Sequence, residues 1–169
     1  MATLGVAVEG DTAMVKVGGR ASFVCGPDFK RVIGALQERG WRKFIFDLSE
    51  CTLMDSTFLG IMAGFGMRVE EAKGEKAILL NASAHVMDLL DNLGVAHLFE
   101  TRQGAPPLSA PCVPATPSAA LDKVEATRTS LDAHQTLIDI NPANAARFKD
   151  VVRFLAEDLK KLEQPPAKG

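Results

Sequence analysis

The residues best suited to chemistry form one short run, Asp55-Ser56-Thr57, which stands at the predicted start of an apolar helix. All three residue types are good helix N-caps, yet a helix needs only one such cap. In one interpretation, one of them caps the helix and the other two are solvated. In the other, Ser56 is a phosphate acceptor, because backbone N–H groups and the positive end of the helix dipole tolerate a phosphate there.

Two kinds of catalytic site are disfavoured by the neighbouring residues. A hydrolase nucleophile at Ser56 would have glycine two residues to either side, and the chain has Met54 and Phe58 at those positions. An aspartate phosphoacceptor at Asp47 would need an acidic pair to hold Mg²⁺ and a lysine after a late strand, and the chain lacks that lysine. We therefore expect a protein that is not an enzyme.

Cofactor and metal sites are not indicated either. The histidines and cysteines are His85, His97, His134, Cys25, Cys51 and Cys112. No two histidines have metal-ligand spacing, so we assign them no role. The cysteines are odd in number and contain no C-x-x-C pair, which favours a reducing cytoplasm over a disulfide framework or a zinc site. Glycines 60, 64 and 66 form no phosphate-binding loop, and we interpret them as allowing close helix approach.

Charge and hydropathy exclude two classes of partner. Nineteen basic and 21 acidic side chains give a net charge of −2, which is not the electrostatic footprint of a nucleic-acid-binding protein. The most apolar run, residues 56–67, is well short of the about 20 residues that span a bilayer. We expect a cytoplasmic protein that binds neither nucleic acid nor membrane.

The elements that position Ser56 are predicted from the spacing of apolar residues. This spacing has a period of two residues in the expected strands and 3.6 residues in the expected helices. Their predicted order is β-β-α-β-α-β-α-β, an α/β layer with a mixed sheet. The strands are expected at residues 4–8, 13–17, 43–48, 77–80 and 98–100, and the helices at 27–39, 56–73 and 85–92.

The chain divides at a proline-rich, uncharged stretch, residues 103–118, which is typical of a semi-extended linker. It separates a body, residues 1–102, from a helical hairpin, residues 119–165. In the hairpin we expect Ser118 to cap a helix over 119–140 and Asn141-Pro142 to begin a second helix. That second helix has an apolar stripe: Phe148, Val151, Val152, Leu155, Leu159 and Leu162. The hairpin either packs on the body or serves as a dimerisation or partner-binding module.

One stretch also resembles a known family. The residues Asp47-Leu48-Ser49, Met54-Asp55-Ser56-Thr57 and Leu59-Gly60, with the element order around them, are similar to the STAS domain of bacterial anti-sigma factor antagonists. The resemblance covers residues 3–102 and implies the STAS fold. It also implies partner switching. In such a system the unphosphorylated antagonist binds an anti-sigma factor and thereby frees the sigma factor. The anti-sigma factor is also a GHKL-type serine kinase, which phosphorylates Ser56. A PP2C-type phosphatase then removes the phosphate and resets the system.

The resemblance implies a partner-binding surface around Ser56. Its expected members are Met54, Asp55, Thr57, Phe58, Arg20 and Ser22. The family commonly has glycine where this chain has Phe58, and it often has an acidic residue near Arg20 that is absent here. The alternative function is a constitutive STAS subunit of a transport or scaffold complex, in which Ser56 only caps a helix.

Overall fold

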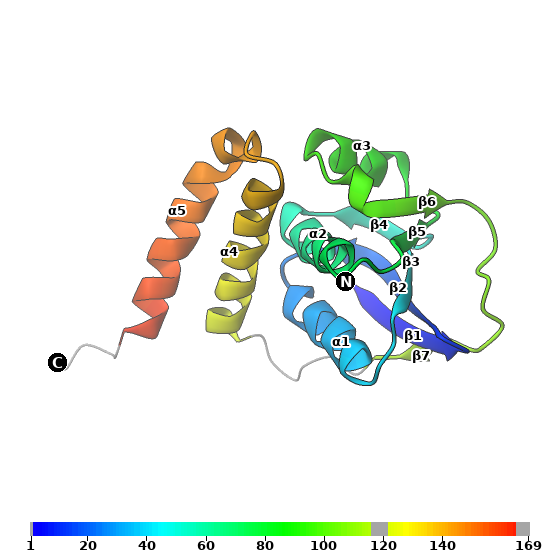
Figure 1. The fold of residues 1–169 in the computed structure, drawn as a ribbon. Helices are drawn as coiled ribbons and strands as arrows, with labels where there is room; N and C mark the ends of the chain where they lie inside the picture. The colour runs from blue at the N-terminus through cyan, green and yellow to red at the C-terminus, as the bar shows by residue number, and fades with distance from the viewer. Residues whose placement is uncertain (1, 116–121, 165–169) are drawn as a thin grey trace.

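The computed structural model describes residues 2–115 and 122–164, and its order of elements is β-β-α-β-β-α-β-α-β-β-α-α with one short 3-10 turn (Figure 1). The strands are β1 (Thr3–Glu9), β2 (Thr12–Ala21), β3 (Lys43–Asp47), β4 (Cys51–Met54), β5 (Ala77–Leu80), β6 (Phe99–Arg102) and β7 (Val113–Pro114). The helices are α1 (Gly26–Glu38), α2 (Ser56–Glu71), α3 (Ala84–Asn92), the 3-10 turn η1 (Ala96–Leu98), α4 (Lys123–Ile140) and α5 (Asn144–Glu163).

The sheet is mixed, as the sequence predicts. Its strands lie in the order β6-β5-β3-β2-β1-β7, and β4 pairs with β2 beside this row. The first two strands form an antiparallel hairpin in which Val6 faces Val15, and Gly10 provides the positive φ of 60° that its tight turn needs. The strands β2, β3, β5 and β6 are parallel neighbours, and the connections between β2, β3 and β5 run through α1 and α2. The α/β prediction is therefore confirmed.

The main core lies between the sheet and the helices α1, α2 and α3. Aromatic rings fill its centre. The Phe29 ring stacks on Phe58 with centroids 4.2 Å apart and meets Phe46 edge-on at 5.7 Å. Both Phe29 and Phe58 are fully buried, so α1, α2 and β3 are held in one packed unit.

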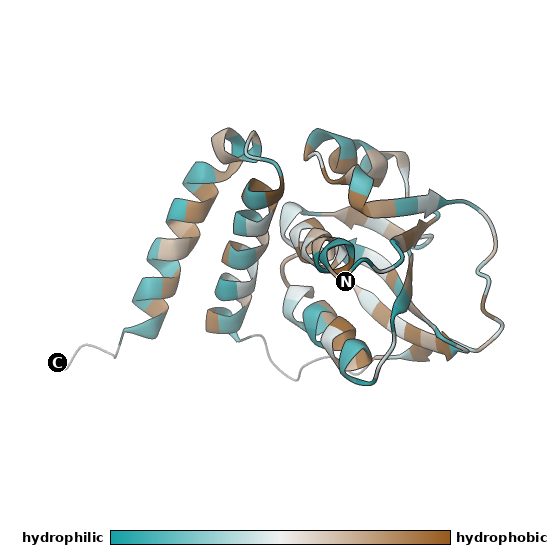
Figure 2. Cartoon of the chain, in the orientation of Figure 1, coloured by the Kyte–Doolittle hydropathy of each residue, from teal (hydrophilic) through white to brown (hydrophobic). Residues whose placement is uncertain are grey.

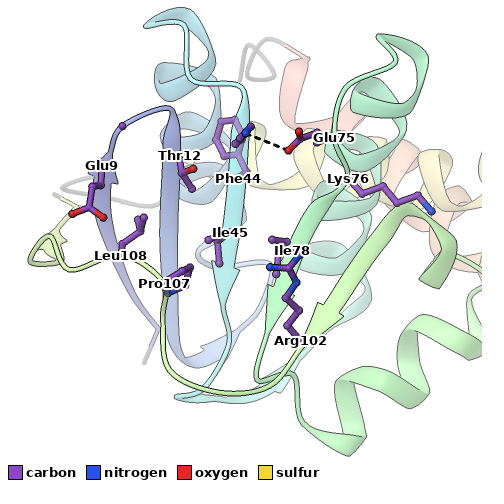
Figure 3. Close-up of a pocket in the computed structure, with 12 residues that line it drawn as sticks. Glu9, Thr12, Phe44, Ile45, Glu75, Lys76, Ile78, Arg102, Pro107 and Leu108 are labelled. Carbon is purple, nitrogen blue, oxygen red and sulfur yellow. Dashed lines mark ion pairs between the residues drawn. The ribbon is translucent and has the colours of Figure 1, made fainter.

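The opposite face of the sheet is partly covered by the proline-rich stretch. Leu108 packs near Ile45 and Ile78, and Figure 3 shows it with Pro107 over the strands. Both residues line a cavity of about 420 Å³. The Ser109 hydroxyl donates a hydrogen bond of 2.7 Å to the Glu9 carboxylate. Beyond this contact β7 pairs with β1. The described part of the predicted linker is therefore bound to the body, because the edge strand β1 supplies hydrogen-bond partners for the linker backbone.

The strand β4, like β7, was not predicted from the sequence. The strand β4 pairs with an extension of β2, with Arg20 opposite Leu53 and Ala21 opposite Met54. Only its two end residues are buried, so it has no alternating apolar pattern to reveal it. This pairing matters because β4 leads directly into α2 and therefore determines where Ser56 lies.

The tail forms the expected helical hairpin, and α4 lies between α5 and the body (Figure 1). The first helix begins at Lys123, where the Asp122 carboxylate accepts hydrogen bonds from the N–H groups of the first turn. The predicted cap, Ser118, lies outside the described residues. The second helix begins at Asn144 instead of Pro142, because the Asn141 side chain accepts from the Ala143 N–H and holds those residues in a turn.

The outer helix is only partly buried. Hydrophilic residues line much of both tail helices in Figure 2, and apolar ones interrupt them. On α5, Phe148 is buried, whereas Phe154 is 58% exposed. Within the described ranges, no helix is long and apolar enough to cross a membrane. The proline-rich stretch at residues 103–118 predicts that residues 1–102 fold without the hairpin, and this stays a prediction.

Candidate functional site

Asp55, and neither of its two neighbours, caps α2. It has extended backbone angles (φ −95°, ψ 172°), and its Oδ1 accepts a hydrogen bond of 2.9 Å from the Phe58 N–H. Its Oδ2 accepts a second bond of 2.8 Å from the Phe23 N–H, which ties the loop before α1 to the start of α2. The hydroxyl groups of Ser56 and Thr57 are therefore not needed as caps.

Ser56 bonds instead to a histidine from the tail. Its Oγ lies 2.7 Å from Nε2 of His134 on α4. The other ring nitrogen, Nδ1, lies 2.7 Å from the Ser130 main-chain oxygen, which can only accept, so Nδ1 carries a hydrogen. In the neutral ring, Nε2 then accepts from the Ser56 hydroxyl. His134 is 4% exposed and meets the Phe148 ring edge-on, whereas Ser56 is half-buried.

Two further positions of α2, Thr57 and Gly60, are also in close contact with α4. The hydroxyls of Thr57 and Ser130 lie 2.7 Å apart, and both residues are buried. Gly60 faces Ala133, and a Cβ built at Gly60 would lie 2.5 Å from the Ala133 carbonyl oxygen. The interpretation that a glycine of this helix allows close helix approach is confirmed at this position, and the approaching helix is α4.

The tail is joined to α1 as well. The Arg31 guanidinium of α1 forms an ion pair with Glu125 of α4 and another with Asp28 of its own helix. Beside this pair, a Cβ at Gly26 would lie 3.7 Å from the Thr129 methyl group. Residues 125–134 of α4 thus cover the starts of both α1 and α2.

The structure separates the predicted partner-binding residues into two groups. Met54 is 2% exposed and Phe58 is fully buried, so both shape the site from inside the core and present almost no surface to a partner. The ring of Phe58, which stands where the family commonly has glycine, packs on Phe29. Asp55 and Ser22 are half-buried, and Thr57 is covered by α4.

The accessible surface around Ser56 is made mainly by residues that sequence analysis did not select. Phe23 is 49% exposed, Val24 54% and Leu53 45%, and Arg20 is exposed beside them. Apolar residues in the loop before α1 are a signal that could have identified Phe23 and Val24. A signal of this kind does not exist for His134, because it is 78 residues from Ser56 in the chain.

A groove of about 630 Å³ opens next to Thr57, between the two tail helices and the Phe23 loop. Its apolar lining includes Ala126 from α4 and Leu155 and Leu162 from α5. The helices of the hairpin therefore do not fill the space between them on the side of the candidate site.

A serine–histidine pair is also the nucleophile and base of many acyl-transfer enzymes. In those sites a third group, commonly a carboxylate, orients the base. Here the orienting group of His134 is a main-chain carbonyl, and the Phe58 N–H at the helix start is occupied by Asp55. The geometry favours a covered hydroxyl over an activated nucleophile. In the described part of the chain, no three His, Cys, Asp or Glu side chains are grouped to hold a metal ion.

Two of the cysteines lie near the site. Burial raises the pKa of the Cys25 thiol, which donates to the Ser22 carbonyl oxygen at 3.2 Å. Burial likewise raises the pKa of Cys51 at the start of β4. A raised pKa lowers the fraction of reactive thiolate at neutral pH, so both residues are suited to structural roles.

Comparison with known proteins identifies the body of the chain. Residues 5–105 match the model of the STAS domain. The fold is similar to that of the anti-sigma factor antagonist SpoIIAA in its unphosphorylated form, with a TM-score of 0.50, 17% identity, and coverage of 61% of this chain and 89% of that one. It is also similar to a putative anti-sigma factor antagonist from Thermotoga maritima, with a TM-score of 0.54, 16% identity, and coverage of 59% and 85%. No curated protein matches the sequence significantly.

Proposed function

The chain belongs to the STAS-domain family, and on that premise we propose that it is an anti-sigma factor antagonist switched by phosphorylation of Ser56. In its unphosphorylated form it binds an anti-sigma factor that is also a GHKL-type serine kinase, and it thereby frees the sigma factor in the cytoplasm of a bacterium. Phosphorylation by that kinase releases the antagonist, and a PP2C-type phosphatase restores it. The protein itself is a binding module without catalytic activity.

One observation carries this proposal. Asp55 takes the whole capping role at the start of α2, so the hydroxyl of Ser56 stands at a helix N-terminus with no main-chain function. A helix start stabilises a nearby anion by roughly 0.3–1 kcal/mol, so the N-terminus of α2 itself favours a phosphate. Fold similarity to a protein described as an anti-sigma factor antagonist in its unphosphorylated form supports the same assignment.

The charge change explains how the switch would work. Phosphorylation adds about −1.5 to −2 charges at neutral pH, directly beside the Asp55 carboxylate. A partner that covers this surface must remove water from both groups, and a like-charge contact at an interface costs several kcal/mol. This repulsion exceeds the gain at the helix start, so the phosphorylated protein dissociates while the fold of its STAS domain hardly changes.

The exposed residues next to Ser56 support a protein partner. Phe23, Val24 and Leu53 form a small apolar surface, and Arg20 adds one positive charge at its margin. Interfaces commonly combine apolar and aromatic contacts with arginine. Met54 and Phe58 would contribute by holding this surface in shape.

The test begins with affinity capture from a bacterial extract followed by mass spectrometry, which identifies the kinase and shows whether Ser56 carries phosphate. Titration calorimetry with the purified kinase then compares wild type with Ser56→Ala, Ser56→Asp, the protein phosphorylated on Ser56 and the control Ser109→Ala, which lies on the linker. We expect Ser56→Asp to bind at least tenfold more weakly, a change of about 1.4 kcal/mol. Equal affinities for all of these proteins, including the phosphorylated one, would reduce Ser56 to a structural residue and favour a constitutive subunit.

A further inference from the structure

We propose that the surface around Ser56 binds a helix, and that α4 of the same chain occupies it in competition with the partner. This inference rests on the proposed function and adds a regulatory element to it, because the hairpin would hold the antagonist in a closed form. A partner helix would then displace α4 and make the contacts that α4 makes in this structure.

The contacts of α4 coincide with the candidate switch. His134 bonds to Ser56, Ser130 bonds to Thr57, and Ala133 lies against Gly60. All three positions lie within the first two turns of α2. A kinase that must reach the Ser56 hydroxyl meets α4 first, so the closed form cannot be its substrate.

The same geometry excludes a phosphate from the closed form. The Oγ of Ser56 is already at hydrogen-bond distance, 2.7 Å, from a ring that is 4% exposed. A phosphorus atom and three further oxygens cannot enter this contact without displacing the ring, because packed interiors do not yield by several ångströms. Phosphorylated Ser56 and docked α4 are therefore mutually exclusive.

The composition of the contact suits a helix that comes off. On the side of the site, the buried side chains of α4 are the imidazole of His134 and four small or hydroxyl-bearing groups, Ala126, Thr129, Ser130 and Ala133, whose removal from α1 and α2 exposes little apolar area. The hydroxyl groups lose one partner and gain water, and such an exchange changes the free energy by only about 1 kcal/mol per hydrogen bond. Docking in the same chain is favoured by a high local concentration of α4, and a tightly binding partner can overcome it.

The far end of the hairpin is attached differently. Leu137 is fully buried in the main core, and the Asn144 amide donates to the main-chain oxygens of Leu93 and Leu137. This end keeps the hairpin beside the body and returns α4 to α2 when the partner leaves. Under this competition, the apparent association constant of the partner equals its intrinsic association constant multiplied by the fraction of molecules that are open.

The test uses the full chain. Ala133→Arg places a long side chain where the Cβ atoms of Ala133 and a residue at position 60 would be only 2.7 Å apart, so α4 cannot dock. The substituted residue lies outside the STAS domain, and the partner surface keeps its composition. Ala156→Arg, at an exposed position of α5, is the matched control. A fourth protein carries phosphoserine at position 56, incorporated during translation, so that no kinase is needed.

Amide hydrogen exchange with peptide resolution reports the state of the hairpin. We expect protection of α4 to fall at least tenfold in Ala133→Arg and in the phosphoserine protein, with β3 and β5 unchanged within twofold and Ala156→Arg equal to wild type. Unchanged protection of α4 in the phosphoserine protein would overturn the inference. Joint loss of protection in α4 and the sheet would overturn it as well, because the hairpin would then be part of the core.

Binding of the kinase identified by affinity capture separates this inference from the proposed function. We expect Ala133→Arg to bind at least tenfold more tightly than wild type, and Ala156→Arg to bind like wild type. Equal binding of wild type and Ala133→Arg refutes competition by α4 and leaves the proposed function intact. If α4 is released as expected but affinity capture with wild type and with Ala133→Arg yields no kinase, the proposed function fails and the intramolecular helix contact stands.

Discussion

Replacing Gly60 by alanine tests the close contact between α2 and α4 directly. A Cβ at this position would lie 2.5 Å from the Ala133 carbonyl oxygen, 2.7 Å from its Cβ and 2.8 Å from its carbonyl carbon. Two of these three atoms belong to the main chain of α4, which cannot rotate away as a flexible side chain can. The helix must therefore move as a whole.

Two effects of opposite sign determine how Gly60→Ala changes the free energy of unfolding. Alanine is favoured over glycine inside a helix by about 1 kcal/mol. Overpacking of a close contact costs roughly 1–3 kcal/mol. Gly34→Ala in α1 isolates the first effect, because nothing lies within 4 Å of a Cβ at that position. We expect Gly34→Ala to be stabilised by up to about 1 kcal/mol and Gly60→Ala to be about 1–3 kcal/mol less stable than Gly34→Ala.

Urea denaturation of wild type and both variants measures these differences, with fluorescence of Trp41 and circular dichroism as two probes. Circular dichroism should detect an earlier loss of helix in Gly60→Ala, because α4 loosens before the sheet unfolds. Equal stabilisation of the two variants would refute the reasoning, since it would mean that α4 does not rest on Gly60.

Three further predictions concern single side chains. Ser56→Ala should lower the free energy of unfolding by about 1–3 kcal/mol in urea denaturation, because it leaves Nε2 of the buried His134 without a partner; an unchanged value would mean that this bond does not form in solution. Asp55→Ala should cost roughly 0.5–2 kcal/mol in the same assay through loss of the helix cap, whereas Asp55→Asn should retain most of the stability. Iodoacetamide at pH 8, followed by peptide mass spectrometry, should modify Cys112 well before Cys51. Burial raises the pKa of both thiols, but Cys112 is exposed to the reagent and Cys51 is buried; equal rates would contradict the burial of Cys51.

The helices and the buried strands could be predicted because each carries its own periodic pattern. The strand β3 is apolar almost throughout, and α2 repeats its apolar residues at helical spacing up to the glycine after its end. Local patterns also located Ser56 at a helix start, since a group of N-cap residues stood before an apolar run. The choice of Asp55 as the cap could not be read locally, because all three residue types are suitable.

The two short strands depended on partners elsewhere in the chain. The edge strand β7 lies in a proline-rich stretch, and it forms only because β1 offers unpaired main-chain groups beside Val113. In the same way β4 exists because β2 runs on to Ala21. Backbone hydrogen bonds between distant segments leave no periodic trace in either segment, so only the tertiary structure decides such pairings.

The contact between Ser56 and His134 is the clearest case of a feature decided by tertiary structure. A lone histidine in an amphipathic helix has no pattern that assigns it a partner, and the sequence alone left open whether the hairpin packs on the body. The amino-acid sequence determined that two amphipathic helices would form and that α2 would contain glycines. Packing decided that Ala133 of α4 would meet Gly60, and this one close approach brings the imidazole within 2.7 Å of the Ser56 hydroxyl.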